Sequence, residues 1–336
     1  MKFSWRSAIG VALSVTLLIW TLHGVSLLAV WHELESSNLL LFIASAIAAT
    51  LIFPLRAYRW KVILHPVAPD LTLGPLWRSL AIGAMVNNLI PARAGEIARA
   101  YALTRETTVS FASSLASLAV DRLFDMVVLL GLGVVALLDP AFPRGARVGG
   151  QTLGHLAQGS IVIVIVLVLA LYMLAFFPSQ LVRVFEVFVR RVSPAVEERG
   201  KSALIRFSAG LSVLKSPARF LWVLAWTVAH WLMNAFAFWL GFKAVGLDLP
   251  FSAALFLQML VAVGVALPSA PGFFGVFEKF ATVGLAIYGV QATQSTSWAI
   301  GYHILTFIPI TVIGIYYFSR LGLSFSELQA QSEAAA

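Results

Sequence analysis

Long apolar runs separated by short polar segments make up most of the chain. A helix of about 17–25 residues crosses a hydrocarbon core ~30 Å thick, and each of these runs is at least that long. We therefore predict membrane-spanning helices near residues 8–30, 39–55, 110–138, 160–178, 220–242 and 298–318. We expect the first to be a retained helix, because it is longer than the apolar part of a typical signal peptide.

Two shorter apolar runs, at residues 76–90 and 251–267, end in segments rich in proline and glycine. The run at residues 76–90 has about 15 residues, and a helix of that length is only ~23 Å long, which is too short to cross the core. Proline stops a helix and glycine lets the backbone turn. We therefore predict re-entrant segments over residues 76–104 and 251–288. The residues that break the helices are Pro91, Gly95, Pro268, Pro271, Gly272 and Gly275.

The two regions repeat one order of features: a short apolar helix, a proline, a glycine, a glutamate and a further helix. Interrupted segments at corresponding places in two halves of a chain are typical of inverted-repeat transporters. The fold class we predict is all-α, a polytopic membrane helix bundle of about six to eight spans, compatible with an inverted repeat. Residues 1–323 would form a single transmembrane domain, and residues 324–336 a polar tail that we expect to be disordered.

The composition agrees with a membrane protein, since 60% of the 336 residues are hydrophobic and 11% are charged, with a mean hydropathy of +0.90. Soluble domains carry about 25% charged residues. The chain has no cysteine, which excludes disulfides and thiolate metal sites. Its six histidines show no metal-ligand spacing, so we predict no metal site and no cofactor.

The formal net charge of +8 is spread between the apolar runs rather than gathered in a patch with aromatic residues. We therefore expect an anionic lipid surface, not nucleic acid, as its counterpart. Residues 32–38 hold two glutamates and no basic residue, whereas residues 181–219 hold eight basic and three acidic ones. By the positive-inside rule we expect a multi-pass protein of the inner (cytoplasmic) membrane with a cytoplasmic N-terminus, and a cytoplasmic amphipathic stretch at 181–219. The basic residues after the second run are Arg56, Arg59, Lys61 and Arg78.

The most polar stretch inside the apolar part of the chain is NNLIPARAGEIARA, at residues 87–100. It places Arg93, Glu96 and Arg99 on one helical face. Charges at membrane depth cost at least ~2.5–3.5 kcal/mol each, so we expect these to have a function. We predict that the two arginines bind a lipid phosphate and that Glu96 orients them. The alternative is a cytoplasmic amphipathic helix whose charges face water. The neighbouring amides that we assign to the same site are Asn87 and Asn88.

The segment RAYRW sets Arg56 and Arg59 three residues apart, on one helical face and next to Trp60. One interpretation is an interfacial anchor, in which basic and aromatic residues lie among the lipid head groups. The other adds binding of a lipid phosphate by the same two arginines.

Three charges, Asp121, Arg122 and Asp125, lie inside the apolar run at residues 110–138. A helix that begins with this run places the two aspartates about 15 and 21 Å into the membrane. Such charges must pair with one another or contact water. We predict an intramembrane network that includes the arginines of the preceding polar stretch, with Glu278 closing it from the second region. The alternative is an ion-pair network with a purely structural role.

Three blocks of sequence carry a family resemblance: RAYRW, NNLIPARAGEIAR with the following SLASLAVDRLFD, and ALPSAPGFFGVFE. They resemble the lysylphosphatidylglycerol synthase transmembrane region family, also called flippase-like integral membrane proteins, over about residues 56–318. The resemblance implies a lipid-translocating module, which in bifunctional members is joined to a soluble aminoacyltransferase domain and in shorter members stands alone. Because few residues follow the last apolar run, we expect no such soluble domain here, so the resemblance implies translocation and not lysyl transfer.

We predict an integral membrane translocator that moves an anionic phospholipid or a polyprenyl-phosphate-linked (isoprenoid) lipid between leaflets. The alternatives are a membrane-embedded transferase with Glu96, Asp121 or Glu278 as general base, and a non-catalytic accessory subunit of a lipid or glycolipid pathway. An enzyme is disfavoured because we find no glycine-rich nucleotide loop, no metal-binding carboxylate pair in a polar loop, and no histidine near the polar clusters. We expect Arg93 and Glu278 to line one water-filled cavity that is reached from opposite sides. The oligomeric state does not follow from the sequence.

Overall fold

The structure is a computed structural model that describes residues 5–90, 94–145, 147–148, 151–152, 162, 166, 169, 216–267, 269–325 and 327–328. Pro91, Arg93 and Pro268 lie outside these residues. So do most of the expected span at 160–178, most of the basic stretch at 181–219 and most of the tail at 324–336.

The described chain is helical apart from one small hairpin, which confirms the predicted all-α class. Its helices are α1 (Trp5–Leu22), α2 (Leu27–Ser36), α3 (Leu39–Leu64), α4 (Leu73–Leu89), α5 (Gly95–Glu106), α6 (Phe111–Leu138), α10 (Pro217–Ala244), α11 (Phe251–Val265), the 3₁₀ turn η3 (Pro271–Phe273), α12 (Val276–Ile287) and α13 (Ala292–Arg320). In the hairpin, β1 (Arg147–Val148) pairs antiparallel with β2 (Gln151–Thr152).

The protein is a polytopic helical membrane bundle. Within the described ranges, α3, α10 and α13 are long and apolar enough to cross a membrane, and α1 with α2 makes a fourth such segment if the bent pair is one span. At 28 residues α6 is as long as these helices, but it carries the three charges Asp121, Arg122 and Asp125. The predicted count of spans includes residues 160–178, which the structure describes only at three positions.

The first apolar run does not form the single helix that we predicted. α1 and α2 meet at a bend of 79°, where Gly24 has a positive φ of 78° that favours glycine. The Ser26 side chain then accepts a hydrogen bond from the Ala29 amide (3.3 Å) and starts α2. Because α2 continues to Ser36, the two glutamates at residues 32–38 lie on a helix.

α3 is longer than predicted. Asn38 caps its first turn by accepting the Leu41 amide (3.1 Å), and the helix passes residue 55 and ends only at Leu64. Arg56 and Arg59 therefore lie inside α3 rather than at its exit. Arg59 is completely buried, so the interfacial-anchor interpretation is wrong for this residue. The physical reason is tertiary, because two carboxylates of α6 pair with it.

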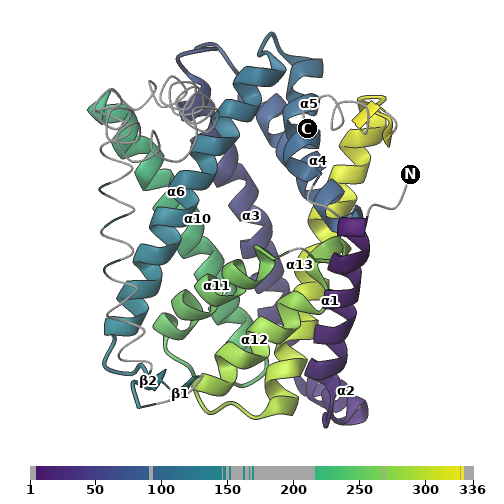
Figure 1. The fold of residues 1–336 in the computed structure, drawn as a ribbon, viewed down its shortest axis with the longest axis vertical. Helices are drawn as coiled ribbons and strands as arrows, with labels where there is room; N and C mark the ends of the chain where they lie inside the picture. Colours follow the sequence, from purple (N-terminus) through teal and green to yellow (C-terminus); the bar gives the residue numbers. More distant parts are fainter. Residues whose placement is uncertain are drawn as a thin grey trace, which may run out of the picture.

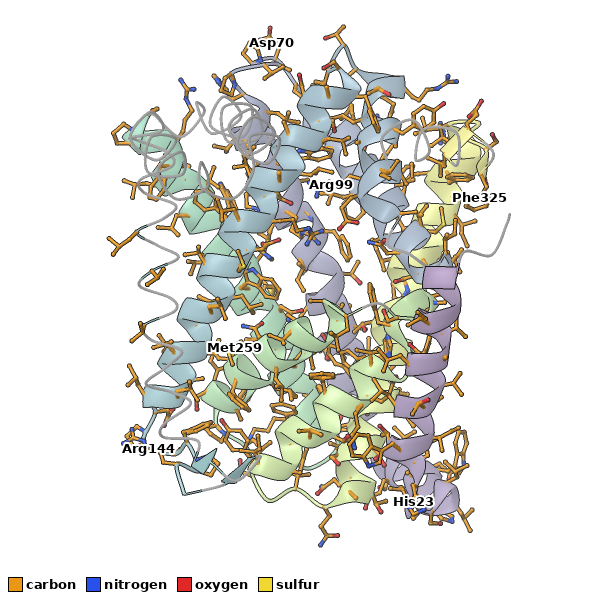
Figure 2. All side chains as sticks on the ribbon, in the orientation of Figure 1. His23, Asp70, Arg99, Arg144, Met259 and Phe325 are labelled. Atoms are coloured by element: carbon orange, nitrogen blue, oxygen red, sulfur yellow. The ribbon has the colours of Figure 1, made fainter. Side chains whose placement is uncertain are left out.

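Long helices run along the axis of the molecule and two pairs of short helices fill opposite ends of it (Figure 1). α4 and α5 lie in the upper half of this view, and α11 and α12 in the lower half. Asp70, which follows α3, and Arg144, which follows α6, mark the two ends (Figure 2). α3 packs against α10, α13 against α4, and α6 against α11. Each short pair is thus held against a long helix from the other half of the chain.

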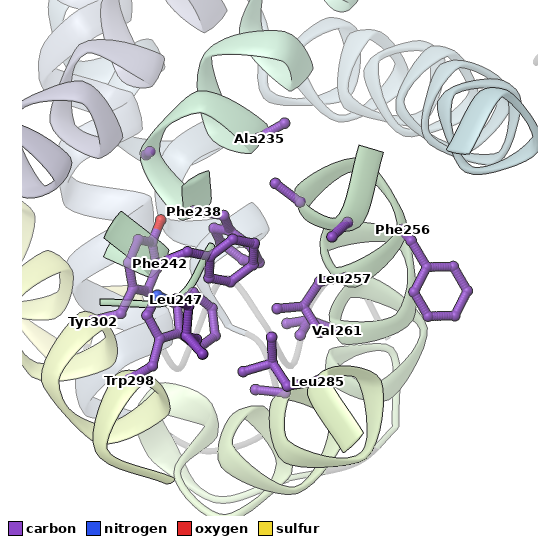
Figure 3. Close-up of a cluster of buried hydrophobic side chains, with 14 of the residues drawn as sticks. Ala235, Phe238, Phe242, Leu247, Phe256, Leu257, Val261, Leu285, Trp298 and Tyr302 are labelled. Carbon is purple, nitrogen blue, oxygen red and sulfur yellow. The ribbon is translucent and has the colours of Figure 1, made fainter. Parts of the chain in front are cut away.

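An aromatic cluster fixes the α11–α12 pair to the long helices (Figure 3). Phe238 of α10 contacts Trp298 and Tyr302 of α13 edge to face, with ring centroids 5.3 and 4.8 Å apart. This geometry suits the quadrupoles of aromatic rings. Phe277 of α12 stacks on Tyr302 with ring centroids 6.0 Å apart.

Glycine permits close approach or positive φ at both helix breaks. A Cβ added to Gly83 of α4 would lie 2.8 Å from the carbonyl oxygen of Gly95, the first residue of α5. The Gly95 amide donates to Asn87 Oδ1 (2.8 Å), which satisfies a free donor of the first turn of α5. In the second break Gly272 and Gly275 have φ of 66° and 82°. The two breaks predicted from sequence are therefore real ends of helices.

The chain beyond α13 folds back onto the bundle as far as it is described. Leu328 is buried in a cluster with Phe318 and Leu323, and the Tyr101 hydroxyl donates to Glu327 Oε2 (3.3 Å). Packed structure thus extends past residue 323, where we expected the polar tail to begin.

We predict that Gly83→Ala lowers the free energy of unfolding by about 1–3 kcal/mol, the usual cost of overpacking, because its new Cβ meets the backbone of α5. Gly131→Ala is the matched control, since a Cβ there has no atom within 4 Å and alanine is the better helix former. Thermal unfolding in detergent measures both variants. Equal midpoints for the two would contradict the close packing of α4 on α5.

Candidate functional site

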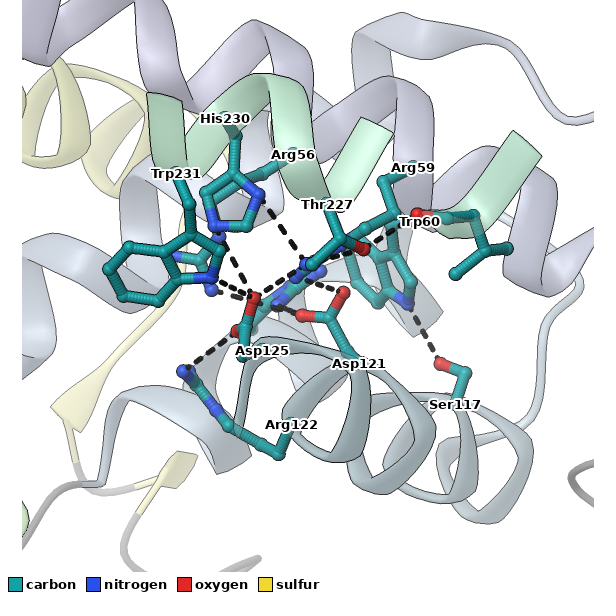
Figure 4. A network of polar contacts seen from close by, with 12 residues as sticks. Arg56, Arg59, Trp60, Ser117, Asp121, Arg122, Asp125, Thr227, His230 and Trp231 are labelled. Carbon is teal, nitrogen blue, oxygen red and sulfur yellow. Dashed lines mark hydrogen bonds and ion pairs between the residues drawn. The ribbon is translucent and has the colours of Figure 1, made fainter. Parts of the chain in front are cut away.

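Charged side chains of α3, α5 and α6 form one cluster inside the bundle, whose centre is shown in Figure 4. Arg59 Nη2 lies 2.6 Å from Asp121 Oδ1, and its Nη1 lies 2.5 Å from Asp125 Oδ1. The Arg59 side chain has no exposed surface, so water does not screen these ion pairs. The described members of the cluster are Arg56, Arg59, Glu96, Arg99, Asp121, Arg122 and Asp125.

Asp121 is shared by two further arginines. Arg99 Nη1 of α5 lies 3.1 Å from Asp121 Oδ2, and Arg56 Nη2 of α3 lies 3.8 Å from it. The Arg99 guanidinium carbon lies 3.8 Å from the ring centroid of Trp60, a cation–π contact that suits a desolvated guanidinium. Trp60 is itself held by a hydrogen bond from its indole N–H to Ser117 Oγ (2.8 Å).

The outer part of the cluster is more exposed. Arg122 Nη2 lies 2.9 Å from Glu96 Oε1, and its Nη1 lies 3.5 Å from Asp125 Oδ2. About half of the Arg122 side chain is accessible. α5 and α6 are therefore joined by two ion pairs: Arg99 with Asp121, which is buried, and Glu96 with Arg122, which is partly exposed.

α10 supplies neutral partners to the same groups. The Trp231 indole N–H donates to Asp125 Oδ1 at 3.1 Å, and His230 Nε2 lies 3.3 Å from that oxygen. Thr227 Oγ1 accepts a hydrogen bond from Arg59 Nη1 at 3.2 Å. Several hydrogen bonds in addition to an ion pair are what a buried carboxylate and a buried guanidinium require.

The described cluster carries more positive than negative charge. Its four arginines and three carboxylates leave an excess of one positive charge when His230 is neutral. Arg56 is the least well paired of the four, since its closest carboxylate oxygen is 3.8 Å away, a longer separation than those of the other three arginines. The excess charge is therefore concentrated at Arg56.

A cavity of about 330 Å³ lies beside the cluster, and both halves of the chain line it. Arg56, Arg122 and Asp125 form part of its wall, and Gly272 and His303 form another part. The volume is at the low end of the ~300–1,000 Å³ that small-molecule sites occupy. Other polar side chains in the wall are Asn88, His230, Trp231, Asn234, Gln258, Tyr302 and Thr306.

Glu278 does not join the arginines. It is buried in the first turn of α12, where its Oε2 accepts the Gly275 amide (2.6 Å) and its Oε1 lies 2.6 Å from His303 Nδ1. The His303 ring lies between Phe274 and Phe277, with both ring centroids 4.5 Å away. His303 of α13 lines the cavity, as do Gln258 of α11 and Phe277 of α12, whereas Glu278 does not.

The two predicted asparagines have different places. Asn87 closes the turn between α4 and α5, whereas Asn88 donates to Thr311 Oγ1 (2.7 Å) and lines the cavity. Among the other predicted site residues, the structure brings Arg56, Arg59, Arg99 and Arg122 together with Glu96, Asp121 and Asp125. Arg93 lies outside the described residues.

We missed both histidines of the site. We predicted no histidine near the polar clusters, which is wrong, because His230 contacts Asp125 and His303 contacts Glu278. The absence of a nearby histidine is therefore no longer a reason to disfavour an enzyme. The signal was present in the sequence, since each histidine is a polar side chain inside an apolar run, where such residues are rare and usually functional. Among the described residues, no three His, Asp or Glu side chains are placed to hold a metal ion.

Comparison with known proteins places the site inside a matched region. Residues 7–314 match the family described as Lysylphosphatidylglycerol synthase TM region. A UPF0104 membrane protein of Methanothermobacter thermautotrophicus is 24% identical over 292 residues, which cover 82% of this chain and 84% of that protein. A second UPF0104 membrane protein of the same organism is 22% identical and covers 98% of this chain and 97% of its own length. Glycosyltransferase AglD of Haloferax volcanii is 28% identical over 267 residues, which cover 72% of this chain but 42% of AglD.

We predict that Arg59→Met lowers the free energy of unfolding by about 3–5 kcal/mol, because it leaves two buried aspartates without their main partner. Arg78→Met is the control. Arg78 pairs with Glu106 at 2.6 Å, but 31% of its side chain is accessible, and such pairs contribute about 0–1 kcal/mol. Denaturant unfolding in detergent measures both losses. Two similar, small losses would mean that the cluster does not hold α3 to α6.

Proposed function

Because the chain belongs to the lysylphosphatidylglycerol synthase TM region family, we propose that it moves an anionic phospholipid or a polyprenyl-phosphate-linked lipid between leaflets. One observation carries this proposal: the arginine-rich cluster has an excess positive charge at the wall of a cavity inside the bundle. A cavity of this kind lowers the cost of bringing a charged head group through the apolar core.

The lipid phosphate would bind at Arg56 and Arg122, which both line the cavity. Guanidinium groups bind phosphate oxygens through two parallel hydrogen bonds, and one phosphodiester charge would balance the excess of the cluster. The carboxylates then act as positioning groups that hold the arginines. We keep Arg93 among the proposed phosphate-binding residues only because of its position in the sequence.

The order of the helices supports an inverted repeat. α3, α4, α5 and α6 have 26, 17, 12 and 28 residues, and α10, α11, α12 and α13 have 28, 15, 12 and 29. In each set an acidic residue of the second short helix pairs with a basic residue of the next long helix. Glu96 pairs with Arg122, which is 26 residues later in the chain, and Glu278 pairs with His303, which is 25 residues later. We propose that the short pairs, at opposite ends of the bundle (Figure 1), are re-entrant segments from opposite faces.

The lipid chains would stay outside the cavity, whose volume suits a head group alone. An apolar groove of about 460 Å³ runs between α3 and α13 and is lined by Thr50, Leu305 and Pro309 among others. Their sequence neighbours Ala49 and Thr306 line the cavity, so α3 and α13 form the partition between the two. Pro309 lies within α13 and removes one of its backbone hydrogen bonds. We propose that the lipid enters by separation of these helices.

The setting we propose is the inner membrane, with the N-terminus and the basic stretch at 181–219 on the cytoplasmic side. α10 begins and α13 ends at the same end of the bundle (Figure 1), as expected if that stretch and the C-terminus share one side. The similarity to a protein named as a glycosyltransferase supports a lipid-linked sugar as one candidate substrate. The chain spans less than half of that relative.

A second function, group transfer to or from a lipid inside the membrane, is favoured by the Glu278–His303 pair. A histidine oriented by a carboxylate is a common general base, and this one lines the same cavity as Arg56. Its Nδ1 is engaged by Glu278, so Nε2 would accept the proton of an attacking hydroxyl group.

In proteoliposomes that contain a fluorescent anionic lipid, we predict that Arg56→Gln slows transbilayer movement about tenfold or more, because a charged hydrogen bond contributes ~1.5–3 kcal/mol. Arg78→Gln is the matched control, since it removes the same charge from the Glu106 pair, which does not line the cavity. Its rate should equal that of the wild type.

Equal rates for the two variants, or wild-type movement no faster than in empty vesicles, would contradict translocation. Mass spectra of the vesicle lipids separate the second function, because an enzyme produces a new lipid species whereas a translocator only redistributes the existing ones.

A further inference from the structure

We propose that the amides of Asn234 and Gln258 form a subsite for hydroxyl groups, so that the cavity selects phosphate lipids whose head group is a polyol over lipids that carry an amine. The inference rests on the translocation proposed above and names the class of its substrate. Glycerol and sugar head groups share this chemistry.

Gln258 is an isolated amide in an otherwise apolar stretch of α11. It is 1% exposed, and its Oε1 accepts a hydrogen bond from Asn234 Nδ2 of α10 at 3.0 Å. Its Nε2 has no hydrogen-bond partner in the described part of the chain. Reversing both amides keeps their mutual hydrogen bond but leaves Gln258 Oε1 unpaired instead. In either orientation one buried polar atom of Gln258 requires a partner from outside the described residues.

The cavity is where that partner can lie, because Asn234 and Gln258 both line it. Trp231, which donates to Asp125 of the charged cluster, also lines the cavity and precedes Asn234 by three residues on α10. Three residues of a helix span ~4.5 Å. A phosphate at the arginines would therefore place the next few atoms of its head group beside the amides.

Hydroxyl groups fit this subsite better than the other common head-group chemistries. A hydroxyl both donates and accepts, so it satisfies the Gln258 amide in either orientation. An ammonium group only donates, and the excess positive charge of the cluster at Arg56 opposes it. A phosphate without a further group would leave the amide unpaired. A guanidinium beside an amide that has one polar atom without a partner among the described residues therefore indicates a ligand in which a phosphate is joined to a polyol.

The test measures binding to the full-length protein in detergent by the rise in its thermal unfolding midpoint, which any ligand of the folded state causes. Four short-chain lipids serve as probes: phosphatidylglycerol, a hexosyl isoprenyl phosphate, phosphatidylethanolamine and phosphatidic acid. We expect the largest rise from one or both of the first two, and which of them it is distinguishes glycerol from sugar.

Gln258→Leu and Asn234→Leu should each weaken the apparent affinity for the hydroxylated lipids by about three- to tenfold, which is the effect of losing one hydrogen bond. The affinity for phosphatidic acid should not change. Gln294→Leu is the matched control, because the Gln294 amide donates to the Val245 carbonyl (3.0 Å) and does not line the cavity. It should keep the preference of the wild type.

Equal stabilisation by phosphatidylethanolamine and the hydroxylated lipids overturns the inference, as does stabilisation by none of the four. So does a loss of affinity in Gln258→Leu that is as large for phosphatidic acid as for the others. This readout is separate from transport. A protein that prefers hydroxylated head groups but moves no lipid contradicts the proposed function alone, whereas one that moves all four at equal rates and binds them equally contradicts the inference alone.

Discussion

Two buried carboxylates on α6 impose the constraint on which the rest of the structure depends. Asp121 and Asp125 have almost no contact with water, and an unpaired charge in a membrane interior is strongly unfavourable. Their partners come from three other helices: Arg59 from α3, Arg99 from α5 and the Trp231 indole from α10. These helices must therefore meet α6 at one depth, and the short α4–α5 pair is held inside the bundle as a result.

We propose that the described cluster is a binding site rather than a purely structural network, on the basis of its charge balance. A structural cluster needs no more arginines than it has carboxylates, whereas the described cluster has one more. Its least paired member, Arg56, lines a cavity whose wall also holds His303 from the other half and Gln258, whose Nε2 has no hydrogen-bond partner among the described residues. A head group with one phosphate charge and several hydroxyl groups would balance the excess positive charge of the cluster and supply the missing hydrogen-bond partner of Gln258.

The periodicity and breaks of the sequence were enough to predict α6, α10 and α13, the two short pairs and a polar cluster that contains Asp121 and Arg99. They did not predict the bend between α1 and α2. They did not place Arg59 in that cluster, because the apolar run of α3 ends near residue 55 while the helix continues to Leu64. Only partners distant in sequence explain why Arg59 is buried there. The pairing of Glu278 with His303 and of Asn234 with Gln258 likewise depends on which helices adjoin, and hydropathy carries no information on that.

The central claim is that the two halves of the chain enclose one anion-binding, water-accessible cavity. Since the chain has no cysteine, single variants Asn88→Cys on α4 and Thr306→Cys on α13 report on its two sides, and Ser79→Cys, buried away from the cavity, is the control. The rate of modification by a small water-soluble thiol reagent is the measurement. The account predicts that both cavity cysteines react, that the control does not, and that an anionic lipid slows both. Reaction at neither position, or rates that the lipid leaves unchanged, would contradict it.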